Sequence, residues 1–504
     1  MTTQLPWKSS GSILGAAVFL GLILFFNPQP DNTAVGRMAA IAALMAILWI
    51  SEAIPLAATA LIPIVLFPLT GVLDGASTTK AYVNSIIFLF IGGFLIALSM
   101  ERWNLHRRIA LNIINAIGKR ADLLILGFMA ASGFLSMWIS NTATAVMMLP
   151  IGLAIILKME EEFGKERSQK LSLALMLGIA YGCSIGGVAT LVGTPTNLAF
   201  VRIFQESFPS APQISFGNWM IIGIPYSLIM LGVTWVLLTR VFCRFDKNLT
   251  LDRSIIKKEI NNLGPIRYEE KAVLVVFAMT VFLWTFRRDL NLGAFSIPGW
   301  SNLWEPLKGI DDGTVAITMA LTLFFIPTKN DPTAVRILQK DIFAKVPWGI
   351  ILLFGGGFAL ASGFTSSGLS TYIGESFRAI GPVPVIVLVI IICISVTFLT
   401  ELTSNVATLS MLLPILASWA VSLHTHPLVF ILPATISSSM AFMMPVATPP
   451  NAVVFGSERI RIIEMARTGL LLNFVAIGFT LLMVYLLFPY VTGTPMGKFP
   501  AWAK

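Results

Sequence analysis

Continuous apolar runs separated by short polar stretches make up most of the chain. Runs that approach or reach the roughly 20 apolar residues needed to cross a bilayer core lie at residues 12–26, 39–50, 56–72, 85–100, 219–238, 272–284, 350–361 and 470–488. Strands of a transmembrane barrel would instead alternate apolar and polar positions over about ten residues. The pattern therefore predicts an all-α polytopic membrane protein.

One polar interruption of an apolar run occurs twice. Ser140, Asn141 and Thr142 interrupt the run in the first half of the chain, and Ser404-Asn405 returns 264 positions after Ser140-Asn141. The glycine cluster at residues 92–93 recurs within residues 355–357 at the same offset. Two landmarks that share one offset indicate a duplicated unit.

Basic residues gather in particular loops and predict how the chain crosses the membrane. Lys and Arg are concentrated in residues 102–108, 119–120, 165–170, 240–271, 329–345 and 458–461, whereas residues 204–215 contain neither. Because short cytoplasmic loops carry the excess of Lys and Arg, we expect the basic loops and the N-terminus in the cytoplasm and the C-terminus outside. Arg287, Arg288 and Lys308 fall outside in this scheme.

With this orientation the two duplicated units are inverted. The span around Gly93 runs towards the cytoplasm, and the span around Gly357 runs away from it. Inverted repeats are typical of secondary transporters, in which broken helices meet near the membrane midplane and form the substrate and ion sites. The pattern therefore favours a transporter over a channel or an enzyme.

The repeats divide the chain into five parts. We expect an N-terminal tail and first span at 1–37, a first repeat at 38–242, a cytoplasmic linker at 243–270, a second repeat at 271–492 and an external tail at 493–504. Each repeat is predicted to hold a re-entrant hairpin, at about 121–158 and 384–422, and a helix broken by proline, at about 171–203 and 428–456. Non-helical backbone at membrane depth is tolerated only where protein buries it or water reaches it, so both hairpin tips should face a cavity.

Composition excludes a soluble protein. Hydrophobic residues make up 56% of the 504 residues, charged residues 12%, and the mean hydropathy is +0.83, against about 25% charge in soluble domains. We attribute the net charge of +9 to the orienting loops rather than to nucleic-acid binding. Cys183, Cys243 and Cys393 fit neither a disulfide framework nor a zinc spacing, and the apolar runs contain no nucleophile–base pair, so we expect no enzyme.

The residues at the two tips suit an anion beside a cation. Ser, Asn and Thr are favoured helix N-caps, and a helix N-terminus that faces a cavity attracts carboxylates and other anions. Two such ends facing each other suit a dicarboxylate, and sulfate is an alternative. Ser136 and Thr400, each five positions before the tip asparagine, add the hydroxyl oxygens that, with backbone carbonyls, suit Na⁺.

Other interpretations of these residues are structural. A single Ser-Asn-Thr in a membrane helix more often forms interhelical hydrogen bonds, but its repetition in an inverted unit favours a site. We assign the two glycine clusters to helix packing. Glu52 and Glu401 lie within apolar segments, where acidic residues are functional candidates, and we favour a structural role for both at helix breaks.

These motifs resemble those of the divalent anion/sodium symporter family, bacterial relatives of the animal sodium–dicarboxylate and sodium–citrate carriers. The resemblance covers essentially the whole chain and includes the Thr-Pro turns at residues 193–197 and 447–451. It implies a homodimer of protomers with about 11 transmembrane helices plus two re-entrant helical hairpins. Each protomer would have a scaffold domain and a transport domain that moves as an elevator.

The resemblance also implies the site residues and at least two sodium ions. One sodium ion would be held by Ser136, Ser140, Asn141 and Gly193, and the other by Thr400, Thr403, Asn405 and Ala447. Substrate would contact Ser140, Asn141, Thr142, Thr194, Ser404, Asn405, Val406, Thr448 and Pro449. Val406 departs from the family's usual threonine, and Thr196 stands where a second proline is common, a change we interpret as minor.

The expected function is sodium-coupled symport of C4-dicarboxylates such as succinate, malate and fumarate across the inner membrane. Alternatives of the same fold are a dicarboxylate exchanger and a sodium-coupled citrate or sulfate carrier. An anion channel is a more distant alternative. The expected partners are the dicarboxylate, membrane lipid and a second copy of the chain, with no nucleic acid.

Overall fold

The computed structural model describes residues 6–118, 120–243, 254–291, 296–329, 335–378, 383–492 and 497–503. In this part of the chain, eight helices are long and apolar enough to cross a membrane, and further apolar helices of 10–17 residues accompany them. A two-stranded ladder, β1 (Leu290–Asn291) and β2 (Ser296–Ile297), is the sheet found among these residues. The expectation of an all-helical, multi-pass membrane protein is confirmed.

The helices follow one another with short connections. The first half contains α1 (Pro6–Phe25), α2 (Ala34–Ser51), α3 (Leu56–Thr59), α4 (Ile62–Thr70), α5 (Gly75–Lys80), α6 (Ser85–Arg102), α7 (Leu105–Ile117), α8 (Ala121–Ser136), α9 (Asn141–Phe163), α10 (Lys165–Gly187), α11 (Pro195–Ser207) and α12 (Phe216–Val236). The second half contains α13 (Ser254–Leu263), α14 (Tyr268–Thr285), α15 (Asp312–Phe325), α16 (Trp348–Ser367), α17 (Leu369–Arg378), α18 (Val385–Thr400), α19 (Asn405–Ser422), α20 (Leu428–Ser438), α21 (Pro449–Phe455) and α22 (Ile462–Thr492).

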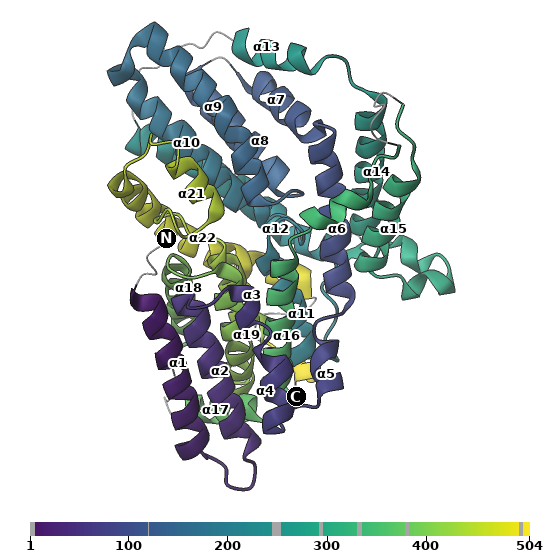
Figure 1. Cartoon of the computed structure of the whole chain (residues 1–504), viewed down its shortest axis with the longest axis vertical. Coiled ribbons are helices and arrows are strands. Elements are labelled where there is room, and N and C mark those ends of the chain that lie inside the picture. Colours follow the sequence, from purple (N-terminus) through teal and green to yellow (C-terminus); the bar gives the residue numbers. More distant parts are fainter. Residues whose placement is uncertain are drawn as a thin grey trace.

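Helices pack both with their sequence neighbours and with helices from distant parts of the chain. Figure 1 shows α8, α9 and α10 side by side and α1 beside α2, and residue contacts agree with both groupings. Helix α6 packs along α15, and α11 contacts both α16 and α19. Helix α11 also contacts α20, and α21 contacts both α9 and α10. The breaks α8–α9, α10–α11, α18–α19 and α20–α21 therefore come together, although two belong to each half of the chain.

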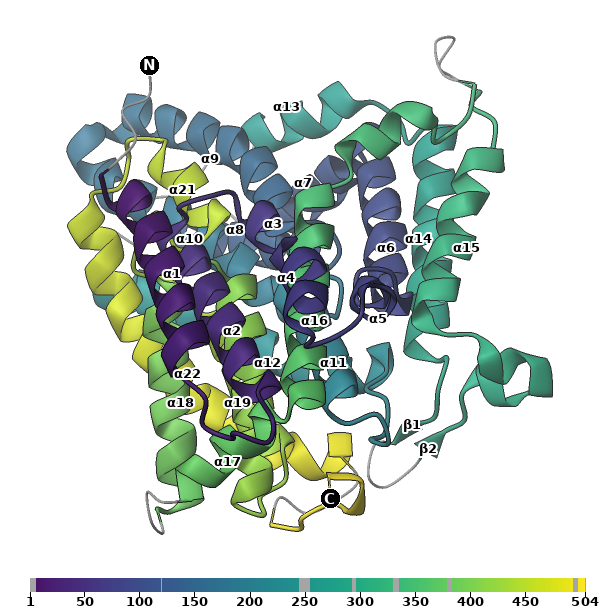
Figure 2. The same ribbon diagram turned by 60° about the horizontal axis from the view of Figure 1, so that its bottom comes forward.

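Connections expected on the cytoplasmic side gather at one end of the molecule. Figure 2 shows α13, the turn between α9 and α10 and the start of α1 at one end, with α17 and the β1–β2 ladder at the other. Ion pairs join several of these basic connections, namely Arg102–Asp341 at 3.2 Å, Arg108–Glu270 at 2.5 Å, Arg107–Glu259 and Arg459–Glu160. The direction in which the molecule sits in the membrane remains a prediction. The expected linker at 243–270 and tail at 493–504 lie partly outside the described residues.

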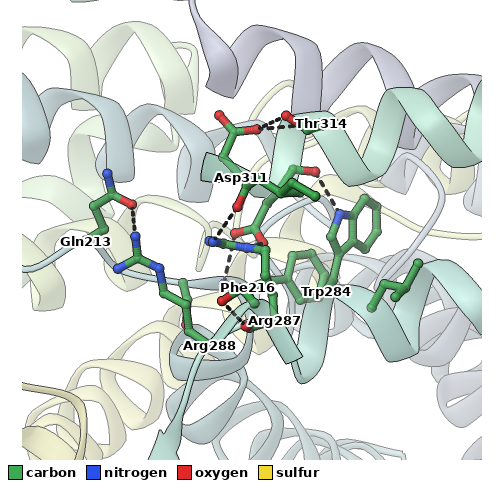
Figure 3. Close-up of polar contacts among 12 residues, drawn as sticks. Gln213, Phe216, Trp284, Arg287, Arg288, Asp311 and Thr314 are labelled. Atoms are coloured by element: carbon green, nitrogen blue, oxygen red, sulfur yellow. Dashed lines mark hydrogen bonds and ion pairs between the residues drawn. The ribbon is translucent and has the colours of Figure 1, made fainter. Parts of the chain in front are cut away.

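A buried ion pair accounts for a basic residue on the expected external side. Arg287 Nε lies 2.5 Å from Asp312 Oδ1, and Arg287 Nη1 donates to the Ile310 carbonyl at 3.1 Å. Asp312 Oδ2 also accepts from the Phe216 amide at 3.3 Å, which ties the start of α12 to the start of α15 (Figure 3). Arg288 donates to Gln213. The Arg287 charge is therefore neutralised internally, which explains why it does not follow the loop-charge pattern.

The repeated glycines allow close helix packing. A Cβ added to Gly92 would lie 2.6 Å from the Ala316 backbone on α15, and one added to Gly356 would lie 2.6 Å from Ala60 beside α3. Gly92 and Gly356 are the same position of the two repeats, 264 residues apart. Because real Cβ atoms do not approach so closely, glycine is required at both contacts. These contacts agree with the packing role inferred from the sequence.

We expect loss of the Arg287 side chain to destabilise the fold more than loss of an exposed lysine. Arg287→Met would leave the Asp312 carboxylate buried without its partner, which typically costs about 3–5 kcal/mol. Thermal unfolding of purified protein in detergent should show a clear drop in midpoint. The Arg287→Met/Asp312→Leu double variant should recover part of it.

Lys308→Met is the matched control. The Lys308 and Glu305 side chains are 53% and 81% exposed, against 4% and 9% for Arg287 and Asp312, and exposed pairs contribute little. Equal effects of Arg287→Met and Lys308→Met on the unfolding midpoint would contradict a stabilising role for the buried pair.

Candidate functional site

Both tips and both Thr-Pro turns border a single cavity of about 620 Å³. All residues expected to contact substrate line it: Ser140, Asn141, Thr142, Thr194, Ser404, Asn405, Val406, Thr448 and Pro449. Of the expected sodium ligands, Ser140, Asn141, Gly193, Thr403, Asn405 and Ala447 also line it. Ser136 and Thr400 lie just behind the wall, hydrogen-bonded to the tip asparagines. The fold thus brings together residues that are up to 313 positions apart, from Ser136 to Pro449.

The first tip presents a capped helix N-terminus to the cavity. Helix α8 ends at Ser136, and α9 starts at Asn141 after a short non-helical segment. Ser140 is the N-cap, and its hydroxyl accepts a hydrogen bond from the Ala143 amide at 3.2 Å. The remaining first-turn amides and the positive end of the helix dipole therefore lie at the cavity wall, where they can attract an anion.

The second tip has the same backbone plan and a different cap. Helix α18 ends at Thr400 and α19 begins at Asn405, with Ser404 as N-cap. The Ser404 side chain makes no capping hydrogen bond, whereas Ser140 does. Val406 lines the cavity and is 8% exposed, so an apolar side chain replaces the hydroxyl that Thr142 supplies in the first tip.

Oxygen atoms cluster behind the first tip. Ser136 Oγ donates to Asn141 Oδ1. A Cβ added to Gly187 would lie 2.7 Å from Asn141 Oδ1 and 3.1 Å from the Gly193 carbonyl oxygen, and one added to Gly193 would lie 2.9 Å from the Ser136 carbonyl oxygen. Two hydroxyl or amide oxygens and several carbonyls thus converge at the end of α10. This donor set suits a hard cation of the size of Na⁺.

The second tip has a matching cluster. Thr400 Oγ1 lies 2.5 Å from Asn405 Oδ1 and 3.0 Å from the Ser438 carbonyl oxygen. Thr403 Oγ1 lies 2.6 Å from Thr408 Oγ1. The threonine–asparagine pair repeats the Ser136–Asn141 pair at the same offset of 264 residues. Neither cluster contains an acidic side chain among its described members.

Two further asparagines hold the unwound segments, and their roles were not assigned from the sequence. Asn197 Nδ2 donates to the carbonyl oxygens of Gly187 and Thr190 at 3.4 and 2.7 Å. Asn451 Nδ2 donates to Ala441 and Met444 at 3.2 and 3.0 Å. Each asparagine thus bonds the carbonyls ten and seven positions earlier. In the sequence, the repeated Thr-Pro-x-Asn order at residues 194–197 and 448–451 could have identified these two asparagines.

Glu401 bonds the unwound segment between α20 and α21. Its carboxylate accepts from the amides of Phe442, Met443 and Met444 at 2.8–3.1 Å and from Asn473 Nδ2 at 2.7 Å. The carboxylate therefore satisfies the amides that the break in the helix leaves free. This agrees with the structural role favoured for Glu401.

The opposite wall of the cavity is largely apolar. Ile50, Leu56, Phe90, Phe94, Ile350 and Leu353 line it, from α2, α3, α6 and α16. Glu52 borders this wall at the end of α2 and has a left-handed backbone conformation, with φ of 47°. Of the residues lining the cavity, Glu52 is the single charged one. An anion in the cavity would therefore be held by helix ends, amides and hydroxyls.

Comparison with known proteins identifies the family and the fold. A family model described as the sodium:sulfate symporter transmembrane region matches residues 9–492. The sodium-dependent dicarboxylate transporter SdcS of Staphylococcus saprophyticus is 43% identical over 488 residues, which is 96% of this chain and 92% of that protein. The protein of the same name in Staphylococcus aureus is 43% identical over 493 residues, 97% of this chain and 92% of the relative.

Solved structures show the same kind of fold at low identity. The YdaH transporter of Alcanivorax borkumensis superposes with a TM-score of 0.57 at 14% identity, over 85% of this chain and 89% of that one. MtrF of Neisseria gonorrhoeae gives 0.54 at 13% identity, over 82% and 84%. These likenesses concern the fold alone.

We expect Asn141→Ala and Asn405→Ala each to weaken cation binding. Each removes an amide oxygen from one cluster, and a hydrogen bond or contact to a charged group typically contributes about 1.5–3 kcal/mol. The sodium concentration that half-saturates uptake should therefore rise roughly tenfold or more. Asn302→Ala, which removes an asparagine bonded to Asp289 outside the cavity, should leave it unchanged. Wild-type sodium dependence in both tip variants would refute the assignment.

We expect Gly187→Ala to act on the same cluster through sterics. The new Cβ would displace the Asn141 carboxamide, because it would lie 2.7 Å from Oδ1. The sodium concentration that half-saturates uptake should rise, while the midpoint of thermal unfolding should change little. Gly232→Ala is a suitable control, since nothing lies within 4 Å of its added Cβ. An unchanged sodium dependence would show that the carboxamide position is not critical.

Proposed function

We propose, on the premise that this chain belongs to the sodium:sulfate symporter family, that it couples the inward movement of sodium ions to the uptake of C4-dicarboxylates such as succinate, malate and fumarate. The chain is a multi-pass membrane transporter and not an enzyme. The single observation that carries the substrate proposal is the cavity into which two helix N-termini from opposite repeats open.

A dicarboxylate matches the two ends of the cavity. One carboxylate would meet the first-turn amides of α9 with Ser140, Asn141 and Thr142, and the other would meet α19 with Ser404 and Asn405. Thr194, Thr448 and Pro449 would complete the pocket from the two Thr-Pro turns. Because Val406 offers no hydroxyl, the second carboxylate would depend more on backbone amides than the first.

Sodium would bind in the two oxygen clusters behind the tips. Ser136, Ser140, Asn141 and Gly193 would hold one ion, and Thr400, Thr403, Asn405 and Ala447 the other. Each asparagine belongs both to an oxygen cluster and to a substrate-binding helix end, so a bound ion would orient the helix end and offset the charge of the anion. This shared use of Asn141 and Asn405 would provide the coupling, because either ligand bound alone would leave its own charge uncompensated in the cavity.

Alternating access would follow from sliding of one wall of the cavity over the other. The hairpins α8–α9 and α18–α19 and the broken helices would form a transport domain, and α2, α3, α6 and α16 would belong to the scaffold. The apolar lining from these four helices supports this division, because an apolar wall lets polar tips pass without binding them. In this proposal the protomer has about 11 spans with two re-entrant hairpins and works as an elevator.

The assembly and orientation complete the proposal. The protein would be a homodimer in the inner membrane, surrounded by lipid, with the N-terminus in the cytoplasm and the C-terminus outside. The ion pairs that join the basic connections at one end support this orientation, since the positive-inside rule places such loops in the cytoplasm. Exchange of dicarboxylates and sodium-coupled carriage of citrate or sulfate are the alternatives.

Uptake of labelled succinate into proteoliposomes tests the function. An inward sodium gradient should raise the initial rate well above that in equimolar potassium, and unlabelled malate or fumarate should compete. Stimulation by internal succinate without sodium dependence would indicate an exchanger. Uptake of sulfate or citrate but not succinate would refute the substrate assignment, and a current without coupling ion would indicate an anion channel.

A further inference from the structure

We propose that Thr196 is a positioning residue for the substrate: together with Ser439 it orients the hydroxyl of Thr194 so that its proton points to the bound anion. This inference rests on the proposed function, in which Thr194 contacts a carboxylate. It also revises the interpretation of Thr196 as a minor replacement of proline.

The observation that supports this proposal is a row of three hydroxyls at the cavity wall. Thr196 Oγ1 lies 3.2 Å from Thr194 Oγ1 and 2.8 Å from Ser439 Oγ. Thr194 and Thr196 stand at the start of α11 in the first repeat, and Ser439 follows α20 in the second. All three line the cavity, and Thr196 is fully buried between the other two. The row therefore connects the two repeats behind the substrate pocket.

The number of protons in this row limits what it can do. Each hydroxyl donates one proton, and the two hydrogen bonds between the three oxygens use two of the three protons. When the two bonds run in the same direction, the third proton is left at one end of the row; when Thr196 accepts from both neighbours, it stays on Thr196. If Ser439 donates to Thr196 and Thr196 donates to Thr194, the Thr194 hydroxyl keeps its proton for a ligand. An anion at the Thr194 end favours this direction, and hydrogen bonds in series strengthen the last donor.

In the second Thr-Pro turn, the threonine hydroxyl also keeps its proton for the cavity, but through a different hydrogen bond. Thr448 is also followed by proline, and its Oγ1 accepts from the Asn451 amide at 3.4 Å, which leaves its own proton for the cavity. Thr194 makes no such capping bond. The residue two positions after each threonine is Thr196 in the first turn and Pro450 in the second. The hydroxyl of Thr196 thus takes the place of the helix amide as the internal donor.

A purely structural role makes a different prediction. If the Thr196–Ser439 hydrogen bond served only to join the repeats, its loss would lower stability or turnover and leave substrate affinity unchanged. If Thr196 acts through Thr194, its loss should change the KM for succinate and leave kcat and the sodium dependence nearly unaltered. The split between KM and kcat therefore separates the two roles.

Sodium-driven uptake of labelled succinate by purified protein in proteoliposomes tests the proposal. Thr196→Val keeps the shape and removes the hydroxyl, and it should raise KM roughly tenfold, the usual effect of losing one hydrogen bond to a charged group. Ser439→Ala should raise KM by several-fold, and Thr196→Ser should restore the wild-type value. Thr194→Val should match or exceed Thr196→Val, and the Thr194→Val/Thr196→Val double variant should be no worse than Thr194→Val alone.

Thr234→Val is the matched control, because it removes another buried hydroxyl, on α12 and away from the cavity lining. It should leave KM unchanged. If Thr194→Val raises KM and neither Thr196→Val nor Ser439→Ala does, the positioning role is overturned while the proposed pocket stands. If Thr194→Val leaves KM unchanged, the pocket assignment and this inference both fall. If the increases in KM of the two single variants add up in the Thr194→Val/Thr196→Val double variant, Thr196 does not act through Thr194 and the proposal is overturned.

Discussion

The structure depends on satisfying backbone polar groups where helices are broken inside an apolar protein. Four breaks, at α8–α9, α10–α11, α18–α19 and α20–α21, leave amides and carbonyls without intrahelical partners, and an unsatisfied group in a membrane costs several kcal/mol. Asn197 and Asn451 donate hydrogen bonds to carbonyls of the unwound segments, and the Glu401 carboxylate accepts hydrogen bonds from three backbone amides. The groups that remain at the cavity wall are those available for ligands.

The two repeats solve this problem with the same backbone and different side chains. Both tips pair an asparagine with a hydroxyl residue five positions earlier. The first tip is capped by Ser140, whereas Ser404 makes no capping bond, and Glu401 stands where the first repeat has Met137. The first break is instead tied by Thr190 Oγ1, which donates to the Met137 carbonyl at 2.5 Å. The cavity is therefore symmetric in plan and unequal in chemistry, so its two helix ends offer a ligand different surroundings.

Much of the architecture followed from the pattern of residues. Apolar runs and low charge predicted a helical membrane protein, and the structure and comparisons confirm it. The family and the transporter class were also predicted correctly from the paired motifs. The repeated Ser-Asn and Thr-Pro motifs pointed to residues that all lie at one cavity or directly behind it. The number of spans, the elevator motion and the sodium ligands remain proposals.

By itself the sequence determined the membrane class, the duplication and the polar residues available at the helix breaks, because these depend on composition and on spacing along the chain. Only the tertiary structure decided which other residues contact and position these polar residues. Thr196 and Ser439 are 243 positions apart and Glu401 and Asn473 are 72 apart, and no local pattern links either pair. Gly187 appeared as one more small residue until the fold placed it against the Asn141 carboxamide. The Thr196–Ser439 contact joins the two halves of the chain, whereas the other two form within one half. All three depend on how separate helices pack, so none could be predicted from local spacing.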